Sequence, residues 1–268
     1  MPFLQTLSQP QLRVSTIRCI ASIIRHFFCA QHRAAFLPGR IRVAQVDHPL
    51  DEKIPFAPEH IGEYLDFVPS WIRSLGFMLK TQGRKSFATA CTFLDSMGAL
   101  YAHAGEVYQR HLSTTKRPFY LGNPRFIPLH ALDPHLMCIP SLHVMVVIRT
   151  YTFFRRELPP FAEKELYQSA IDITESVLFV KQHSVNCISA ALYAMSCFEP
   201  ELFPPAEAAR FVGDLFADER LDACDAREIR SHILSLYQRF LREGETARGN
   251  GGHWTKPLVD FLKALPPQ

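Results

Sequence analysis

Apolar residues recur every three or four positions along most of this chain, and this spacing constrains its fold more than any other feature. Such a period is typical of helices that bury one face against a core. Alternation of β-branched and polar residues, which would predict strands, is nearly absent. We therefore predict an all-α protein, a bundle of about eight or nine helices. The expected helical segments are 12–36, 59–80, 84–111, 140–156, 160–182, 184–198, 205–217, 225–243 and 255–264.

The composition is that of a globular protein with a substantial core. Its 268 residues suffice for one large domain or two small ones, and apolar residues make up 47% against 21% charged. A net charge of +3 without a long basic run predicts no nucleic-acid partner. The seven cysteines are scattered without a C-x-x-C pair, which predicts reduced thiols and no disulfide scaffold or metal site.

Residues 12–36 have the pattern of a basic amphipathic helix. One interpretation is a helix that lies on an anionic membrane surface, a peripheral contact. The other is a helix docked on the core with its basic face in solvent. The expected apolar face holds Ile17, Ile20, Ile23, Ile24 and Phe27, and the opposite face Arg18, Arg25 and His32.

Location and domain organisation follow from the same patterns. The sequence contains no run of about 18 apolar residues, so we predict no membrane span. Its N-terminus lacks the features of a secretory signal. We expect a cytoplasmic or peripheral membrane location. Three parts are predicted: a basic amphipathic segment at 1–45, a helical core at 46–200 and a helical C-terminal extension at 201–268.

The middle of the chain carries groups that suit an anion. Arg110 and Arg117 are forks that bind phosphate through two N–H groups, and Lys181 offers a point charge. Pro140 and Ser141 favour the start of a helix, where free N–H groups attract anions. Each residue alone has a commonplace structural explanation, so the prediction depends on their order and spacing.

Two histidines, His143 and His183, stand at the edges of two apolar segments in the same region. Phosphoryl transfer through a covalent phosphohistidine needs such a pair. A neutral histidine attacks phosphorus, and a protonated one gives its proton to the leaving oxygen.

This ordered set resembles the type 2 phosphatidic acid phosphatase and vanadium haloperoxidase superfamily, in particular its lipid-phosphatase and sphingolipid-synthase-like branch. The resemblance covers roughly residues 50–198, and it includes "IPF" at 54–56 and "KQHSV" at 181–185. The three ordered motifs are Arg110 with Arg117-Pro118 after six residues, Pro140-Ser141-Leu142-His143, and Ser176 with His183 after six residues.

The resemblance implies a phosphatase that hydrolyses a phosphomonoester, such as a phosphorylated small molecule or a lipid phosphate. His183 would be the nucleophile, and His143 the acid that protonates the leaving alcohol. No cofactor or metal is implied, and vanadate would bind the same pocket as a phosphate mimic. The residues that would hold the phosphate oxygens are Arg110, Arg117 and Ser141, with Lys181 as an additional cation.

Two positions depart from the family pattern, which makes the third motif degenerate. Val177 stands where the family has an arginine, and Lys181 or Arg125 could replace that cation. Cys187 stands where the family has the aspartate that orients the nucleophilic histidine, and a thiol orients an imidazole poorly. The carboxylates that could compensate are Asp133, Asp172 and Glu175.

Several functional classes therefore remain open. The first is a phosphoric monoester hydrolase of the acid or lipid phosphatase type, with a transferase that moves a phosphorylated head group as its variant. The second is a pseudoenzyme that binds a phosphorylated ligand or a protein partner, which Val177 and Cys187 favour. The third is a structural helical domain in which the motif matches are accidental.

Overall fold

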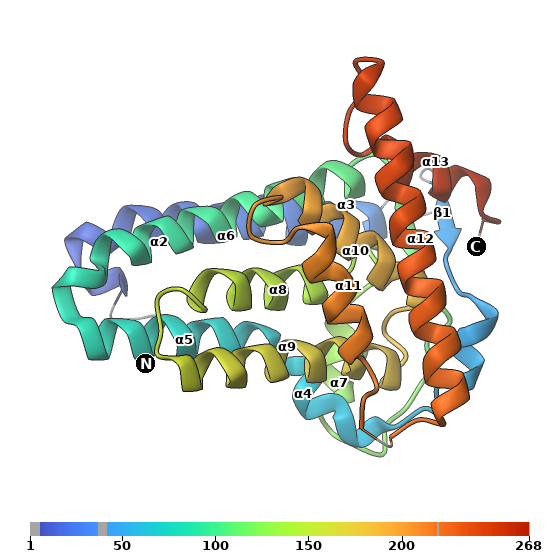
Figure 1. The fold of residues 1–268 in the computed structure, drawn as a ribbon, viewed down its shortest axis with the longest axis horizontal. Helices are drawn as coiled ribbons and strands as arrows, with labels where there is room; N and C mark the ends of the chain where they lie inside the picture. The colour runs from blue at the N-terminus through green and yellow to red at the C-terminus, as the bar shows by residue number, and fades with distance from the viewer. Residues whose placement is uncertain (1–5, 37–41, 219, 268) are drawn as a thin grey trace.

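The computed structural model describes residues 6–36, 42–218 and 220–267, and their helices confirm the all-α class (Figure 1). Residues 1–5 and 37–41 of the predicted segment 1–45 lie outside the described residues. The α-helices are α2 (Pro10–Ile23), α3 (Cys29–Phe36), α4 (Ile61–Leu65), α5 (Phe67–Gln82), α6 (Phe87–Tyr108), α7 (Phe126–Leu132), α8 (Leu142–Phe154), α9 (Pro160–Phe179), α10 (Val185–Phe198), α11 (Pro205–Asp214), α12 (Ala223–Gly249) and α13 (Lys256–Ala264). The shorter elements are the π-helical turn η1 (Ile24–Phe28), the 3-10 turns η2 (Pro49–Lys53), η3 (Pro58–His60) and η4 (Gly83–Ser86), and the strands β1 (Val43–Gln45) and β2 (Leu112–Thr114).

Helix α8 lies at the centre of the bundle and contacts α5, α6, α9 and α10. Nearly all of its residues are buried, because its sequence is apolar on every side. In Figure 1 the helices α2, α6, α8, α5 and α9 run side by side, whereas α12 crosses the end of this group. None of the helices that the described residues form is both long and apolar enough to cross a bilayer.

Helix α2 and the turn η1 pack closely along α6 because α6 presents glycines to both of them. A Cβ atom at Gly98 would stand 3.3 Å from the Cα of Cys19, and one at Gly105 would stand 3.0 Å from the Cβ of His26. The hydroxyl of Ser22 donates to the carbonyl of Gly98. The first part of the predicted segment 12–36 is therefore docked on the core by small side chains.

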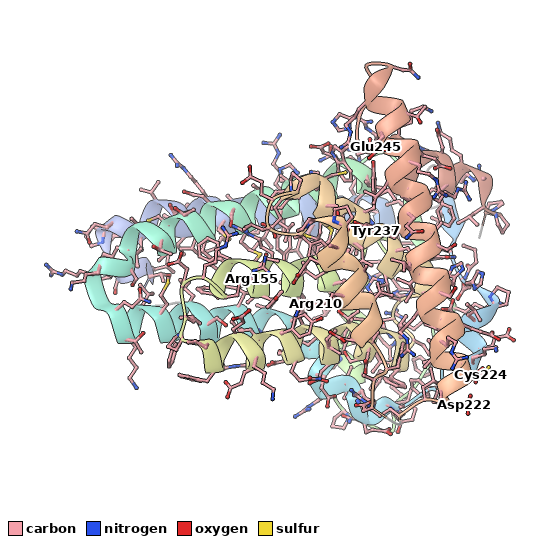
Figure 2. The ribbon with its side chains drawn as sticks, in the orientation of Figure 1. Arg155, Arg210, Asp222, Cys224, Tyr237 and Glu245 are labelled. Atoms are coloured by element: carbon pink, nitrogen blue, oxygen red, sulfur yellow. The ribbon has the colours of Figure 1, made fainter. Side chains whose placement is uncertain are left out.

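The C-terminal helices are tied to the core at several points. Figure 2 shows Arg155 and Arg210, which connect the end of α8 to α11: Arg155, directly after α8, donates to Glu207 of α11, and Arg210 of α11 donates to the hydroxyl of Tyr151 on α8. Asp222 caps α12 by accepting from the backbone N–H of Cys224 at 2.8 Å. Halfway along α12, Tyr237 lies 2.8 Å from the hydroxyl of Ser196 on α10, oxygen to oxygen.

A small parallel sheet, absent from our prediction, forms where β1 pairs with β2 in the register Val43 with Leu112. Its strands have three residues each, which is too short for a visible alternation of side chains. Ser113 of β2 also receives hydrogen bonds from Cys138 N–H at its carbonyl and from Ile139 N–H at its hydroxyl. These bonds fix the segment that leads into α8, and so they place the first predicted histidine.

Candidate functional site

His143 is the second residue of α8, and its ring is held between aromatic side chains of two other helices. The Tyr64 ring of α4 stacks on it at 4.5 Å with an angle of 26°, and the Phe67 ring of α5 lies at 4.1 Å, measured between centroids. Ser141 occupies the N-cap position of α8, and its N–H donates to the carbonyl of Cys187 at 3.3 Å. The start of α8 is thereby fastened to α10.

His183 lies in the tight connection between α9 and α10. The N–H groups of Gln182 and His183 both donate to the carbonyl of Val177, at 3.0 and 3.1 Å, which closes the turn after α9. Ser184 then caps α10 by accepting from Asn186 N–H. This turn brings Nε2 of His183 to 3.4 Å from Nδ1 of His143. The two predicted histidines, 40 residues apart in the chain, thus form a direct contact.

Burial lowers the pKa of both histidines. The pKa of His183 falls from 6.5 to about 4, an effect that the backbone of Cys138 partly opposes. The pKa of His143 lies well below 6.5 because of burial and the nearby rings of His183 and His135. Both rings are therefore neutral at pH 7, so one of them donates an N–H to the other. A bound anion would favour the protonated form and raise these pKa values.

The cavity beside the histidine pair has a volume of about 30 Å³. Since one water needs roughly 10–15 Å³ of such space, a few waters fit and a phosphate group does not unless side chains withdraw. A hollow of about 770 Å³ between α2, α5 and η4 is much larger, but no histidine lines it. The small cavity is lined by Phe27, Gln31, Tyr64, Asp133, His135, Met137, Cys138, Leu142, His143, Gln182 and His183.

Arg117 lies next to this cavity and binds two of its lining residues. Its Nη1 donates to Oε1 of Gln182 at 3.3 Å, and its Nη2 donates to the carbonyl of Asp133 at 3.2 Å. The Asp133 carboxylate is 3.6 Å from Nη1 and also accepts from the side chain of Gln31 and the N–H of His135. Burial raises the pKa of Asp133, and the Arg117 charge opposes this. Asp133 therefore supplies the counter-charge for Arg117 when no other anion is bound.

None of the four predicted phosphate ligands lines the cavity itself, although Arg117 binds two of the lining residues. Arg110 is exposed, and its Nη1 donates to the hydroxyl of Thr255 at 3.2 Å. Lys181 has a left-handed backbone, with φ of 55°, and its ammonium group donates to the carbonyls of Asp51 and Ile54. The Ser141 hydroxyl is buried without a hydrogen-bond partner among the described residues.

The two degenerate positions are both fully buried. Val177 packs in the core, and its carbonyl closes the turn before His183. The thiol of Cys187 accepts from Ser184 N–H at 3.4 Å, and burial raises its pKa well above 9. Nδ1 of His183 is buried without a hydrogen-bond partner of normal geometry among the described residues. Cys187 therefore belongs to the cap of α10 and does not take the orienting role of the family's aspartate.

The substitutes weighed for the missing groups lie in different places. Asp172 and Glu175 both pair with Arg220, at 3.3 and 2.8 Å, and Glu175 also accepts from Phe216 N–H. Arg125 is exposed at the start of α7. Only Asp133, of these candidates, lines the cavity. Its carboxylate is committed to Arg117, Gln31 and the backbone of His135.

Sequence reasoning missed several members of the site. His135 has a left-handed backbone, with φ of 58°, and its Nε2 lies 2.7 Å from the hydroxyl of Thr115. Burial lowers the pKa of His135 to about 3. Gln182 could have been suspected because it stands beside His183. Gln31 gave no signal, because it reaches Asp133 across 102 positions of the chain.

The fold and the site define an all-α protein with two histidines in contact beside an arginine. Comparisons with protein-family models, curated proteins and solved structures return no match for this chain. The resemblance to the phosphatase superfamily therefore stays a prediction. Within 6–36, 42–218 and 220–267, no group of three or more histidine, cysteine, aspartate or glutamate residues could hold a metal ion.

The lowered pKa of His183 predicts a pH-dependent contribution to stability. The unfolded chain takes up a proton near pH 6.5, whereas folded His183 does so only near pH 4. Folding stability contributed by the neutral ring is therefore lost as the pH falls from about 6.5 to 4, by at most about 3 kcal/mol. Urea unfolding of the wild type and of His183→Gln at several pH values measures this difference.

The comparison with His183→Gln is needed because other groups titrate with the opposite sign. Burial raises the pKa of Glu175 to about 7, so its protonation stabilises the folded state as the pH falls. This effect is common to both proteins and cancels in the difference. A difference that stays constant from pH 7 to pH 4 would contradict the prediction.

Proposed function

We propose that this protein binds a phosphomonoester beside the His143–His183 pair and hydrolyses it through a phosphohistidine at His183. The observation that carries the proposal is the contact of 3.4 Å between Nε2 of His183 and Nδ1 of His143, with Arg117 bound to Gln182 of the same cavity. The substrate is a phosphorylated small molecule or a lipid phosphate, and the location is cytoplasmic or at the membrane surface.

The reaction has two steps. In the first, neutral His183 attacks phosphorus, the P–O bond to the alcohol breaks, and His143, protonated when the anion binds, gives its proton to the leaving oxygen. In the second, water attacks phosphorus while His143 takes a proton from that water, and the P–N bond breaks to release phosphate and neutral His183. The low pKa of His183 suits the first step because a neutral ring keeps a lone pair on one of its nitrogens.

Ligand binding requires movement around the cavity, because the volume of about 30 Å³ is too small for a phosphate. The two rings also stand too close for a phosphoryl group to lie between them. Arg117 is the cation that an incoming phosphate would bind in place of the Asp133 carboxylate. Withdrawal of Asp133 and Gln31 would free both the cation and the space.

A second candidate function is binding without turnover. The observation that favours it is that Nδ1 of His183 has no carboxylate partner, because Cys187 stands at the orienting position. In a serine protease, loss of the orienting carboxylate lowers turnover by ~10⁴. Substitution Cys187→Asp tests this candidate: a gain of phosphate release would indicate a decayed enzyme.

Vanadate binding is the experiment that tests the site, with Arg117→Gln and Arg110→Gln as a matched pair. Loss of a hydrogen bond to a charged group weakens binding by roughly 10- to 100-fold. We expect that loss for Arg117→Gln and no change for Arg110→Gln, whose side chain is engaged by Thr255. The measurements are titration calorimetry with vanadate and phosphate release from p-nitrophenyl phosphate.

The outcomes separate the classes of function. Binding with phosphate release supports the phosphatase, and binding without release supports the second candidate. If vanadate does not bind the folded wild type, both are contradicted and the helical domain is structural. Equal loss in both arginine variants would instead place Arg110 in the site.

A further inference from the structure

The side of the N-terminal helix that faces away from the bundle is apolar. Its large side chains are about half exposed although each is hydrophobic. They follow one another at intervals that place them, with exposed Ala21, along one side of a helix. This docking stripe consists of Val14 (54% exposed), Ile17 (53%), Ile24 (49%) and Phe28 (49%).

The stripe differs from the apolar face expected from the sequence. The residues buried against α6 are mostly small, because Gly98 and Gly105 of α6 allow a close approach that larger side chains would prevent. Ile17 and Ile24 are thereby left in solvent. The buried side of α2 consists of Leu12, Ser15, Thr16 and Cys19.

Arginines follow both edges of the docking stripe. Successive helical residues are rotated by about 100°, so Arg18 and Arg25 lie on the edge that follows Ile17 and Ile24. Arg13 lies on the other edge, and all three arginines are exposed. No aspartate or glutamate occurs between positions 6 and 36. The arginines next to the stripe therefore have no acidic partner within their own helix.

We propose that the docking stripe binds an anionic lipid bilayer, with α2 and η1 lying parallel to the membrane surface. The apolar side chains would enter the boundary between head groups and acyl chains, and the arginines would extend to the lipid phosphates. Negative surface charge is the complement of a helix that carries arginines and no acids. A second copy of the chain fits less well, because it would set arginine against arginine.

Flotation of the full-length chain with lipid vesicles tests this proposal. Vesicles of phosphatidylcholine that contain phosphatidylserine should bind the protein, pure phosphatidylcholine should bind it weakly, and added salt should release it. Since each arginine near an anionic surface is worth about 1 kcal/mol, Arg18→Gln with Arg25→Gln should weaken binding roughly 30-fold. Ile24→Ser with Phe28→Ser should weaken it at least about 10-fold on both kinds of vesicle.

Matched controls lie on other helices. Phe161 of α9 is 61% exposed, so Phe161→Ser removes a comparable aromatic side chain. Arg239→Gln with Arg242→Gln removes two exposed charges from α12. Both controls should bind vesicles like the wild type, and unchanged melting curves establish that all variants fold. No enzymatic readout is involved, so the result does not depend on the proposed phosphatase activity.

Three results would overturn the proposal. The folded wild type could stay free of anionic vesicles. The controls could lose as much binding as the stripe variants, which would indicate non-specific adsorption to the vesicles. Finally, sedimentation could reveal a dimer that Phe28→Ser dissociates while vesicles bind nothing, which would assign the stripe to self-association.

Discussion

Substitution His183→Ala is expected to lower phosphate release by at least about 10³-fold and to remove any acid-labile phosphoprotein. The reason is that His183 is the histidine in direct contact with His143. Among the described residues, the other histidine that lines this cavity is His135, and its Nε2 is engaged by Thr115. General acid–base assistance alone contributes 10²–10⁴-fold, and the nucleophile itself would also be lost. Rapid quench with labelled substrate measures the phosphoprotein, and a colorimetric assay measures the turnover.

Two further variants make this result specific. His103 is another histidine whose pKa burial lowers, to about 4, but it is only partly buried and stacks on Trp254 outside the site. His103→Gln should therefore leave turnover unchanged. His143→Ala should be more harmful with an alkyl phosphate than with p-nitrophenyl phosphate, because p-nitrophenolate leaves without a proton. Equal losses with both substrates would refute the acid role of His143.

Substitution Arg149→Met is expected to destabilise the fold by about 3–5 kcal/mol, because it leaves a buried carboxylate without its partner. Arg149 is 6% exposed and pairs with Glu199, and it also donates to the hydroxyl of Ser96 at 2.8 Å from Nη2. Thr152 donates to the other oxygen of Glu199 at 2.6 Å. Urea unfolding at neutral pH measures the loss.

The double substitution Arg149→Met with Glu199→Gln is the control for this effect. It removes both charges, so most of the lost stability should return. Since burial already raises the pKa of Glu199, the single variant should also suffer less at pH 5 than at pH 8. A double variant as unstable as the single one would indicate that packing, and not the unpaired charge, causes the loss.

The helical class could be predicted because apolar periodicity is a local property. The predicted helix 59–80 corresponds to α4 and α5, which meet at Asp66, and the predicted helix 184–198 corresponds to α10 almost residue for residue. The pairing of β1 with β2 could not be predicted, because three-residue strands leave no pattern and the partners lie about 70 positions apart.

The positions of site residues could be predicted only where the local sequence determines the local structure. Pro-Ser-Leu-His places His143 at a helix start, and the turn after α9 places His183 opposite. Spacing could not predict that Thr255, 145 positions later, engages Arg110. Nor could it predict the left-handed backbone at Lys181, which directs the ammonium group to carbonyls of η2 and its flank. The positions of the Arg110 and Lys181 side chains depend on partners that are far away in the sequence. A single sequence does not show which distant residues come close together in space.

The π-helical turn η1 sets the rotational phase between α2 and α3. A π turn holds one residue more than an α turn. In this turn two neighbouring side chains have different environments, because Phe27 lines the histidine cavity whereas Phe28 is 49% exposed. Deleting one residue from Ile24–Phe28 would let α2 continue as a regular helix and rotate all of α3 by about 100°. Gln31 would then lose its hydrogen bond to Asp133, while α2 would remain packed on α6. The additional residue of the π turn thus sets how the docking stripe and the cavity-lining residues Phe27 and Gln31 are oriented relative to each other.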